Sequence, residues 1–216
     1  HSEALEAAGV SEMGLASERA PPRWDVARPD DSRFYHEGEP LYEFANFFRR
    51  GLVVEGVQCK SAEHAFQAEK FEEPELRERI LQAPTPRAAL ELTRNEPFRS
   101  SVVGGWHGGR KRKAMMKVLR AKFAAGSELR ALLLGTGSSR IIEDTDNDRY
   151  WGGGIDGLNV LGCCLMAVRS EAQRHEAGET DDTVRPVSGR RAGDTERRAT
   201  RMLAERVASG GATLPP

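Results

Sequence analysis

Hydrophobic residues recur at helical spacing in several stretches of the chain. Ser61 to Phe71 begins with a good helix N-cap and continues with strong helix formers, so it predicts a helix. Between Lys111 and Ala125 the apolar residues fall at i, i+3, i+4 and i+8, which predicts the longest helix, with one face towards the core. Shorter helices are expected at residues 75–81, 87–92 and 128–134, and a closing helix from residue 160 to about 172.

Short apolar runs predict the strands. Leu52–Val54 and Val57 flank the pair Glu55-Gly56, which is typical of a β-hairpin with a tight turn. Ile141–Glu143 has the character of a further strand, and residues 144–159 have the composition of a loop. The pattern therefore predicts an α+β fold, predominantly helical, in a single domain with a small β-hairpin or sheet.

Composition limits the organisation of the chain. Its 216 residues, 30% of them charged and 38% hydrophobic, fit one globular domain with polar ends. We expect a disordered leader at 1–31, the folded domain at 32–172, and a disordered tail at 173–216 with a helical patch at Met202–Val207. The net charge of −1 provides no general attraction to nucleic acid or an anionic membrane. Three cysteines without metal-binding spacing, no signal peptide and no membrane-length apolar run lead us to expect a reducing, cytoplasmic location.

One helix face carries candidate chemistry. Glu63, Gln67 and Lys70 stand at i, i+4 and i+7 of the helix that begins after Ser61, so they share one side of it. A carboxylate, an amide and an amine on one rigid surface suit a functional site. A solvent-exposed face with one charge pair is the more common meaning of this pattern.

Two glycine-rich loops each hold a tryptophan. Trp106 lies between glycine pairs, which makes it less typical of a core than a helical Trp, and Arg110, at the start of the following basic run, could contact phosphate. In the second loop Asp148 and Trp151 precede the glycines that begin at Gly152, whose backbone could cradle phosphate or simply form a turn.

A calcium site is not expected in the acidic loop. Asp144, Asp146 and Asp148 match the first ligands of an EF-hand loop, but Arg149 stands at the required glycine and Ile155 at the bidentate glutamate. The remaining chemistry is two acids, an amine and two flat aromatic side chains. That set suits cleavage of a bond to an aromatic base.

Taken in order, six stretches resemble the NADAR (YbiA-like) family and cover residues 34 to 169. They read FYHEGEPLYEFANFF, SAEHAFQAEKF, GGWHGGRKRKAMMKVLRAKF, LRALLLGTG, IIEDTDNDRYWGGG and LNVLGCCLMAVR. The resemblance implies a mostly helical single domain that acts as an N-glycosidase, without a metal ion or redox cofactor. Two activities are associated with such proteins: removal of ADP-ribose from guanine bases of nucleic acid, and cleavage of early riboflavin-pathway intermediates.

The resemblance also implies roles for particular residues. Catalytic positions of the family fall on Glu63, Trp106, Asp148 and Trp151, and Lys70 falls on a lysine that could capture the ribose C1 as a Schiff base. Pocket positions fall on Asn46, Phe47, Gln67 and Asn159. The sequence departs from the family at Tyr42, Ala45, Cys59-Lys60 and Ala65, around the pocket rather than at its acids, so the departures affect the choice of substrate.

Three functions follow as hypotheses. The first is a hydrolase that removes ADP-ribose from guanine, with ADP-ribosylated nucleic acid as its partner and no membrane involved. The second is a glycosidase of riboflavin intermediates, and the third is a non-catalytic module that binds ADP-ribose or NAD. The glycosidase hypotheses require the carboxyl groups of Glu63 and Asp148 to converge in one cleft.

Overall fold

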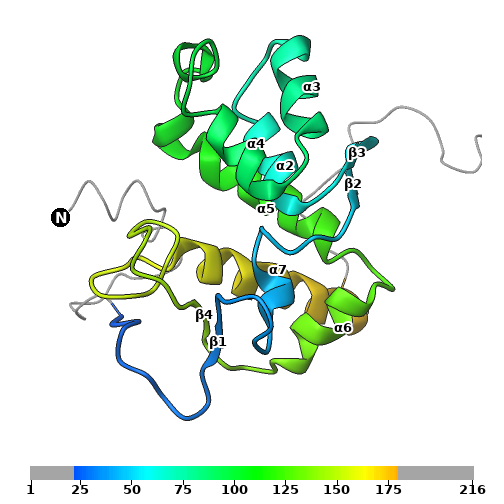
Figure 1. The fold of residues 1–216 in the computed structure, drawn as a ribbon. Helices are drawn as coiled ribbons and strands as arrows, with labels where there is room; N and C mark the ends of the chain where they lie inside the picture. Colours follow the sequence, from blue (N-terminus) through cyan, green and yellow to red (C-terminus); the bar gives the residue numbers. More distant parts are fainter. Residues whose placement is uncertain (1–21, 180–216) are drawn as a thin grey trace, which may run out of the picture. The chain divides into compact units, whose positions relative to one another are not determined.

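The computed structural model describes residues 22–179. The elements of this part are drawn in Figure 1. In chain order they are β1 (Ser32–Phe34), η2 (Tyr42–Phe44), β2 (Leu52–Val54), β3 (Val57–Cys59), α2 (Ala62–Ala68), α3 (Pro74–Gln82), α4 (Pro86–Leu92), η3 (Arg99–Ser101), η4 (Trp106–Arg110), α5 (Lys111–Lys122), α6 (Glu128–Gly135), β4 (Ile141–Glu143) and α7 (Val160–Glu176). The fold is α+β and mostly helical, as expected. Residues 1–21 of the predicted leader and the patch at Met202–Val207 lie outside the described residues. Residues 22–31 of that leader are described and contact the domain, for example through the ion pair between Asp31 and Arg140.

Local sequence chemistry explains where the helices begin. The hydroxyl oxygen of Ser61 accepts the backbone N–H of His64 at the start of α2, and Thr85 and Ser127 cap α4 and α6 in the same way. Proline at the first turn of α3 and α4 costs no hydrogen bond. The predicted helices of this region are therefore confirmed.

Two helix lengths differ from expectation. α5 ends at Lys122 because Phe123 leaves helical geometry, so the expected end at Ala125 is too late. α7 continues to Glu176 and is longer than α5, so the expected end near Ala172 is too early. After Gly162 in its first turn, α7 meets no glycine or proline until Gly178, whose φ of 77° favours glycine.

The strands form two separate pairs. β2 and β3 are antiparallel, and Glu55 and Gly56 both have positive φ in the turn between them, which confirms the predicted hairpin. β4 pairs in parallel with β1, with Ser32 opposite Ile141. The partner of β4 comes from the other end of the domain, which the local pattern did not predict.

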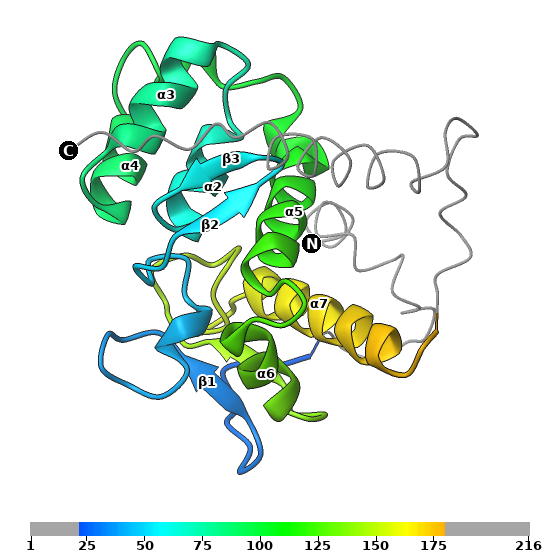
Figure 2. The same ribbon diagram turned by 90° about the vertical axis from the view of Figure 1, so that its right-hand side faces the viewer.

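Helix α2 lies within the packed interior (Figure 2). It packs against α3 and α4 on one side and α5 on the other, and all of its residues are buried. The interpretation of its polar face as a solvent-exposed surface is therefore wrong, because neighbouring helices cover that face. The apolar stripe predicted on α5 is buried as expected: Met115, Val118, Leu119 and Phe123.

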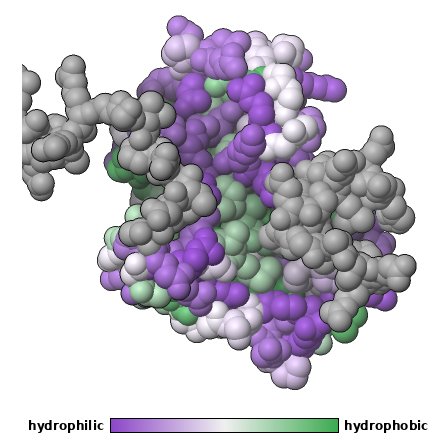
Figure 3. Space-filling model, turned by 180° about the vertical axis from the view of Figure 1, so that it is seen from behind, coloured by the Kyte–Doolittle hydropathy of each residue, from purple (hydrophilic) through white to green (hydrophobic). Residues whose placement is uncertain are grey.

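The surface of the described region mixes hydrophilic and apolar zones. On the face seen from behind, an apolar strip lies between hydrophilic surfaces (Figure 3). No helix in residues 22–179 is both long enough and apolar enough to cross a bilayer. Within the same residues, no three side chains of His, Cys, Asp or Glu are grouped so that they could hold a metal ion.

Candidate active site

Glu63 is a buried carboxyl group on α2. The amide Nε2 of Gln67, one turn along, donates to its Oε1 over 2.6 Å, and its backbone N–H donates to the carbonyl of Asn46. Burial raises the pKa of Glu63 to about 7, while the amides of Gln67 and Asn46 and the charges of Lys70 and Arg87 act in the opposite direction. A carboxyl group with this pKa can exchange protons near neutral pH.

Lys70 follows α2 and is connected to Glu63 through polar side chains. Its Nζ donates to the hydroxyl of Thr93 over 3.5 Å, and that hydroxyl lies 3.4 Å from Oε1 of Gln67. Burial lowers the pKa of Lys70, the charge of Glu63 opposes this, and the charge of Arg94 adds to it. A lowered pKa increases the fraction of neutral amine, which is the nucleophilic form.

Trp106 and Trp151 both pack against Phe66. Ring centroids are 5.4 Å apart for Phe66 and Trp106 and 5.5 Å apart for Phe66 and Trp151. Trp106 begins the π-helical turn η4 and is buried in the core, so the expectation that a glycine loop would keep it out of the core is wrong. The backbone N–H of Val103 donates to the carbonyl of Lys70, which keeps this turn beside the end of α2.

The acidic loop presents Asp148 next to Trp151. Its Oδ1 accepts the backbone N–H groups of Tyr150 and Trp151 at 2.9 and 3.0 Å, which fixes the carboxylate at this turn. The Nζ of Lys111, from the first turn of α5, lies 3.1 Å from the centre of the Tyr150 ring. Burial lowers the pKa of Lys111, and the charge of Asp148 opposes that shift.

Glu143, the last residue of β4, is a site residue that the sequence analysis did not select. Burial, with a smaller contribution from the negative charges of Asp148 and Glu63, raises the pKa of Glu143 to about 8. Glu63 and Asp148 therefore act on one carboxyl group although they come from distant segments. The only hint in the sequence was an acid at the end of an apolar strand directly before the acidic loop.

Asn46 and Phe47 border this group of residues. The Oδ1 atom of Asn46 is buried and has no hydrogen-bond partner among residues 22–179, and its Nδ2 contacts the sulfur of Met115. A buried, unpaired amide oxygen is suited to a ligand donor. The ring of Phe47 lies 5.5 Å from the guanidinium carbon of Arg87.

Gly152 and Asn159 serve the loop itself. The N–H of Gly152 donates to the carbonyl of Asp148, and a Cβ at Gly152 would lie 2.5 Å from the carbonyl oxygen of Thr145. Asn159 accepts the N–H of Glu143 and donates to the carbonyl of Ile141. Both groups hold the loop against β4, and their polar atoms are engaged within the protein.

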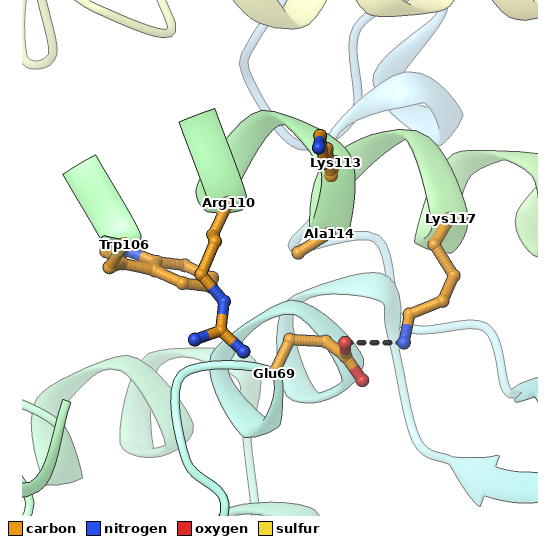
Figure 4. Close-up of a pocket in the computed structure, with 6 residues that line it drawn as sticks. All are labelled: Glu69, Trp106, Arg110, Lys113, Ala114 and Lys117. Atoms are coloured by element: carbon orange, nitrogen blue, oxygen red, sulfur yellow. Dashed lines mark ion pairs between the residues drawn. The ribbon is translucent and has the colours of Figure 1, made fainter. Parts of the chain in front are cut away.

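Arg110 lies beside Trp106 in a groove of about 270 Å³ (Figure 4). The groove is lined by Glu69, Trp106, Arg110, Lys113, Ala114 and Lys117. Arg110 pairs with Glu72 and Lys117 pairs with Glu69 and Glu55, so most of its positive charge is balanced. Neither Glu63 nor Asp148 is among the residues that line this groove.

Two other arginines border the buried acids. Arg87 on α4 acts electrostatically on Glu63, and Arg94, just past the end of α4, acts on Lys70. Arg87 and Arg94 are both exposed, and neither has a carboxylate partner among the described residues. Unpaired guanidinium groups at the edge of a site are suited to phosphate.

The buried acids, the desolvated amine and the two indoles lie within one small α+β domain. A family model, the NADAR domain, matches residues 33–173, and the chain belongs to this family. The NMR structure of the Escherichia coli protein YbiA is similar, with a TM-score of 0.63 and 33% identity over 76% of this chain and 97% of that one.

Named relatives fall into two groups. N-glycosidase YbiA of Shigella flexneri is 39% identical over 142 residues, which are 64% of this chain and 86% of the relative. The riboflavin biosynthesis protein VVA0006 of Vibrio vulnificus is 35% identical over 144 residues, 66% of this chain and 38% of that longer protein. The relatives' names support an N-glycosidase type of function within the family.

Proposed function

We propose that this protein hydrolyses an N-glycosidic bond to ribose and that its favoured substrate is ADP-ribosylated guanine in nucleic acid. The observation that carries the proposal is the buried carboxyl group of Glu63, which shares a polar connection with Lys70 beside the two indoles. Such a group can exchange a proton and also stabilise positive charge that develops at the ribose C1.

The residues divide the work as follows. Trp106 and Trp151 shape the space for an aromatic base, and Asp148 and Glu63 supply negative charge to the oxocarbenium-like centre. Lys70, with its lowered pKa, is placed to capture C1 as a Schiff base that water then hydrolyses. The unpaired arginines beside Glu63 and Lys70 favour a substrate that carries phosphate, and ADP-ribose carries two.

A second candidate substrate has its own support. Riboflavin biosynthesis proteins from Vibrio vulnificus and Zea mays are relatives, which favours an early riboflavin-pathway intermediate. A non-catalytic reader of ADP-ribose or NAD is the third possibility. The presence of Glu63, Lys70 and Asp148 in one electrostatic neighbourhood argues against it.

One experiment separates the three functions. The protein is incubated in parallel with an ADP-ribosylated guanine oligonucleotide and with the riboflavin intermediates, and the products are identified by mass spectrometry. We expect release of ADP-ribose and restoration of unmodified guanine. Cleavage of the riboflavin intermediates alone would replace the first substrate with the second. If calorimetry shows tight binding of ADP-ribose and no product forms, the proposal that the protein is an enzyme is refuted.

A control pair makes the result specific to the site. Glu63→Gln removes the acid, whereas Glu75→Gln changes an exposed acid in the first turn of α3. Product release should disappear in the first variant and persist in the second. Equal activity in both would locate the chemistry elsewhere.

A further inference from the structure

Glu143 is an unusual carboxyl group for a strand end. Its Oε2 atom is buried and has no hydrogen-bond partner among the described residues. An isolated ionised carboxylate is costly to bury, and a protonated one is much less so. The geometry therefore favours a neutral acid that retains a hydrogen to donate.

Among residues 22–179, no positively charged group acts on the Glu143 carboxyl. On β1, Phe34 stands opposite Glu143, and the neighbouring Arg33 is engaged with Asp31 and Asp144. On α7, which packs on β4, Arg169 donates to Thr136 and to the carbonyl of Ser139. The charges that act on Glu143 are those of Asp148 and Glu63, and both are negative.

The position of Glu143 is fixed by backbone bonds. Its N–H donates to Asn159 Oδ1, and its carbonyl accepts the N–H groups of Thr145 and Gly153. These bonds fold the acidic loop back onto β4 and keep Asp148 in electrostatic contact with the Glu143 carboxyl. When carboxyl groups lie close together, one can stay protonated and act as the acid, while the others stay ionised and stabilise positive charge.

We propose that Glu143 is the general acid of the site and that its carboxyl proton is transferred to the departing base as the glycosidic bond breaks. This inference rests on the glycosidase function proposed above. The bond between C1 and the base nitrogen breaks, its electron pair goes to that nitrogen, and the base takes up the proton of Glu143. Water then supplies the hydroxyl group of the ribose, directly or by hydrolysis of a Lys70 adduct, and its other proton returns to the Glu143 carboxylate.

The pH profile follows from this assignment. Glu143 acts as an acid only below its pKa of about 8, and Glu63 carries negative charge only above its pKa of about 7. As pH increases, kcat/KM should therefore rise near the pKa of Glu63 and fall near the pKa of Glu143. Removal of the Glu143 acid should eliminate the falling limb.

The test uses two leaving groups. Wild type, Glu143→Gln and Glu143→Asp are assayed on ADP-ribosylated guanosine and on a 4-nitrophenyl riboside, whose leaving group needs no proton. We expect Glu143→Gln to lower kcat/KM roughly 100-fold or more on ADP-ribosylated guanosine but far less on the activated riboside. Glu143→Asp keeps an acid and should restore part of the rate and the falling limb. Thermal melts of the three proteins show that they fold.

The outcomes distinguish the two proposals. If wild type cleaves neither compound, the proposed function and the acid role both fail. If wild type is active and Glu143→Gln lowers kcat/KM by the same factor for both leaving groups, or does not lower it, only the acid role fails. A ¹³C titration of labelled glutamate adds a direct check, because a Glu143 carboxyl ionised below pH 5 would also overturn the acid role.

Discussion

Replacing Glu63 with Gln should make the protein more stable and much less active. The amide of the variant can still accept from Gln67 through its own oxygen, so the buried hydrogen bond between the two helix positions is kept. What disappears is the carboxyl group that can ionise. The two effects have one cause, which is the burial of this acid between α2 and its neighbouring helices.

The size of the stability effect follows from the pKa. Moving the pKa of Glu63 from 4.5 to about 7 corresponds to about 3 kcal/mol against the ionised form. Because the folded protein holds this proton more tightly than the unfolded chain, the stabilisation is fully present below pH 4.5 and is lost as pH rises through about 7. The Glu63→Gln variant has no ionisable group at this position, so its stability does not change with pH for this reason. The stabilisation from the Glu143 proton is also lost as pH rises in both proteins, but less so in the variant, because the charge of Glu63 contributes to the raised pKa of Glu143.

Urea unfolding at pH 5 and pH 8 measures this directly. The two proteins should have similar unfolding free energies at pH 5, and the variant should be ahead by up to about 3 kcal/mol at pH 8. For a domain of this size that is roughly 6–12 °C in Tm. Turnover should fall by about 10²–10⁴-fold, with substrate binding retained. A stability difference that is the same at both pH values, or undiminished release of base, would refute the reasoning.

Three further predictions concern the supporting residues. Lys70→Met should abolish a covalent adduct that cyanoborohydride traps from wild type and substrate, and an adduct in the variant would exclude Lys70 as the nucleophile. Phe66→Ala should cost about 3–5 kcal/mol in urea unfolding because it removes a buried ring that packs against both indoles; a loss below 1 kcal/mol would contradict that packing. Lys122, whose buried Nζ donates to the carbonyls of Phe44 and Ala45, has a pKa lowered to about 7. The folded protein therefore binds this proton less tightly, and stability should rise with pH from about 7 towards 10.5 in wild type; the same rise in Lys122→Met would contradict the assignment.

Much of the candidate site could be anticipated from short-range pattern. The shared face of Glu63, Gln67 and Lys70 follows from helical spacing, and the structure connects these three side chains through hydrogen bonds and Thr93. The motif order also identified the family, which the match over residues 33–173 confirms. Thr93 itself carried no distinguishing pattern, because a single threonine after a helix is ordinary.

Other features depended on contacts between distant segments. Arg110 was chosen because it begins a basic run beside Trp106, and Asn159 because of the family resemblance. The structure gives Arg110 an acidic partner and gives Asn159 two backbone partners on β4. Glu143 was not selected because its neighbours in the sequence do not reveal its character. Its character comes from burial and from two acids elsewhere in the chain, which no local window contains.

The sequence by itself determined the helices, the hairpin and the side chains that share a helix face, because those depend on residues within a turn or two of each other. The tertiary structure decided which of those faces are buried, that β1 meets β4, and that the charges of Glu63 and Asp148 act on Glu143. Desolvation is the physical reason. A carboxyl group acquires its proton affinity from whatever packs around it, and in this protein the packing comes from both ends of the domain.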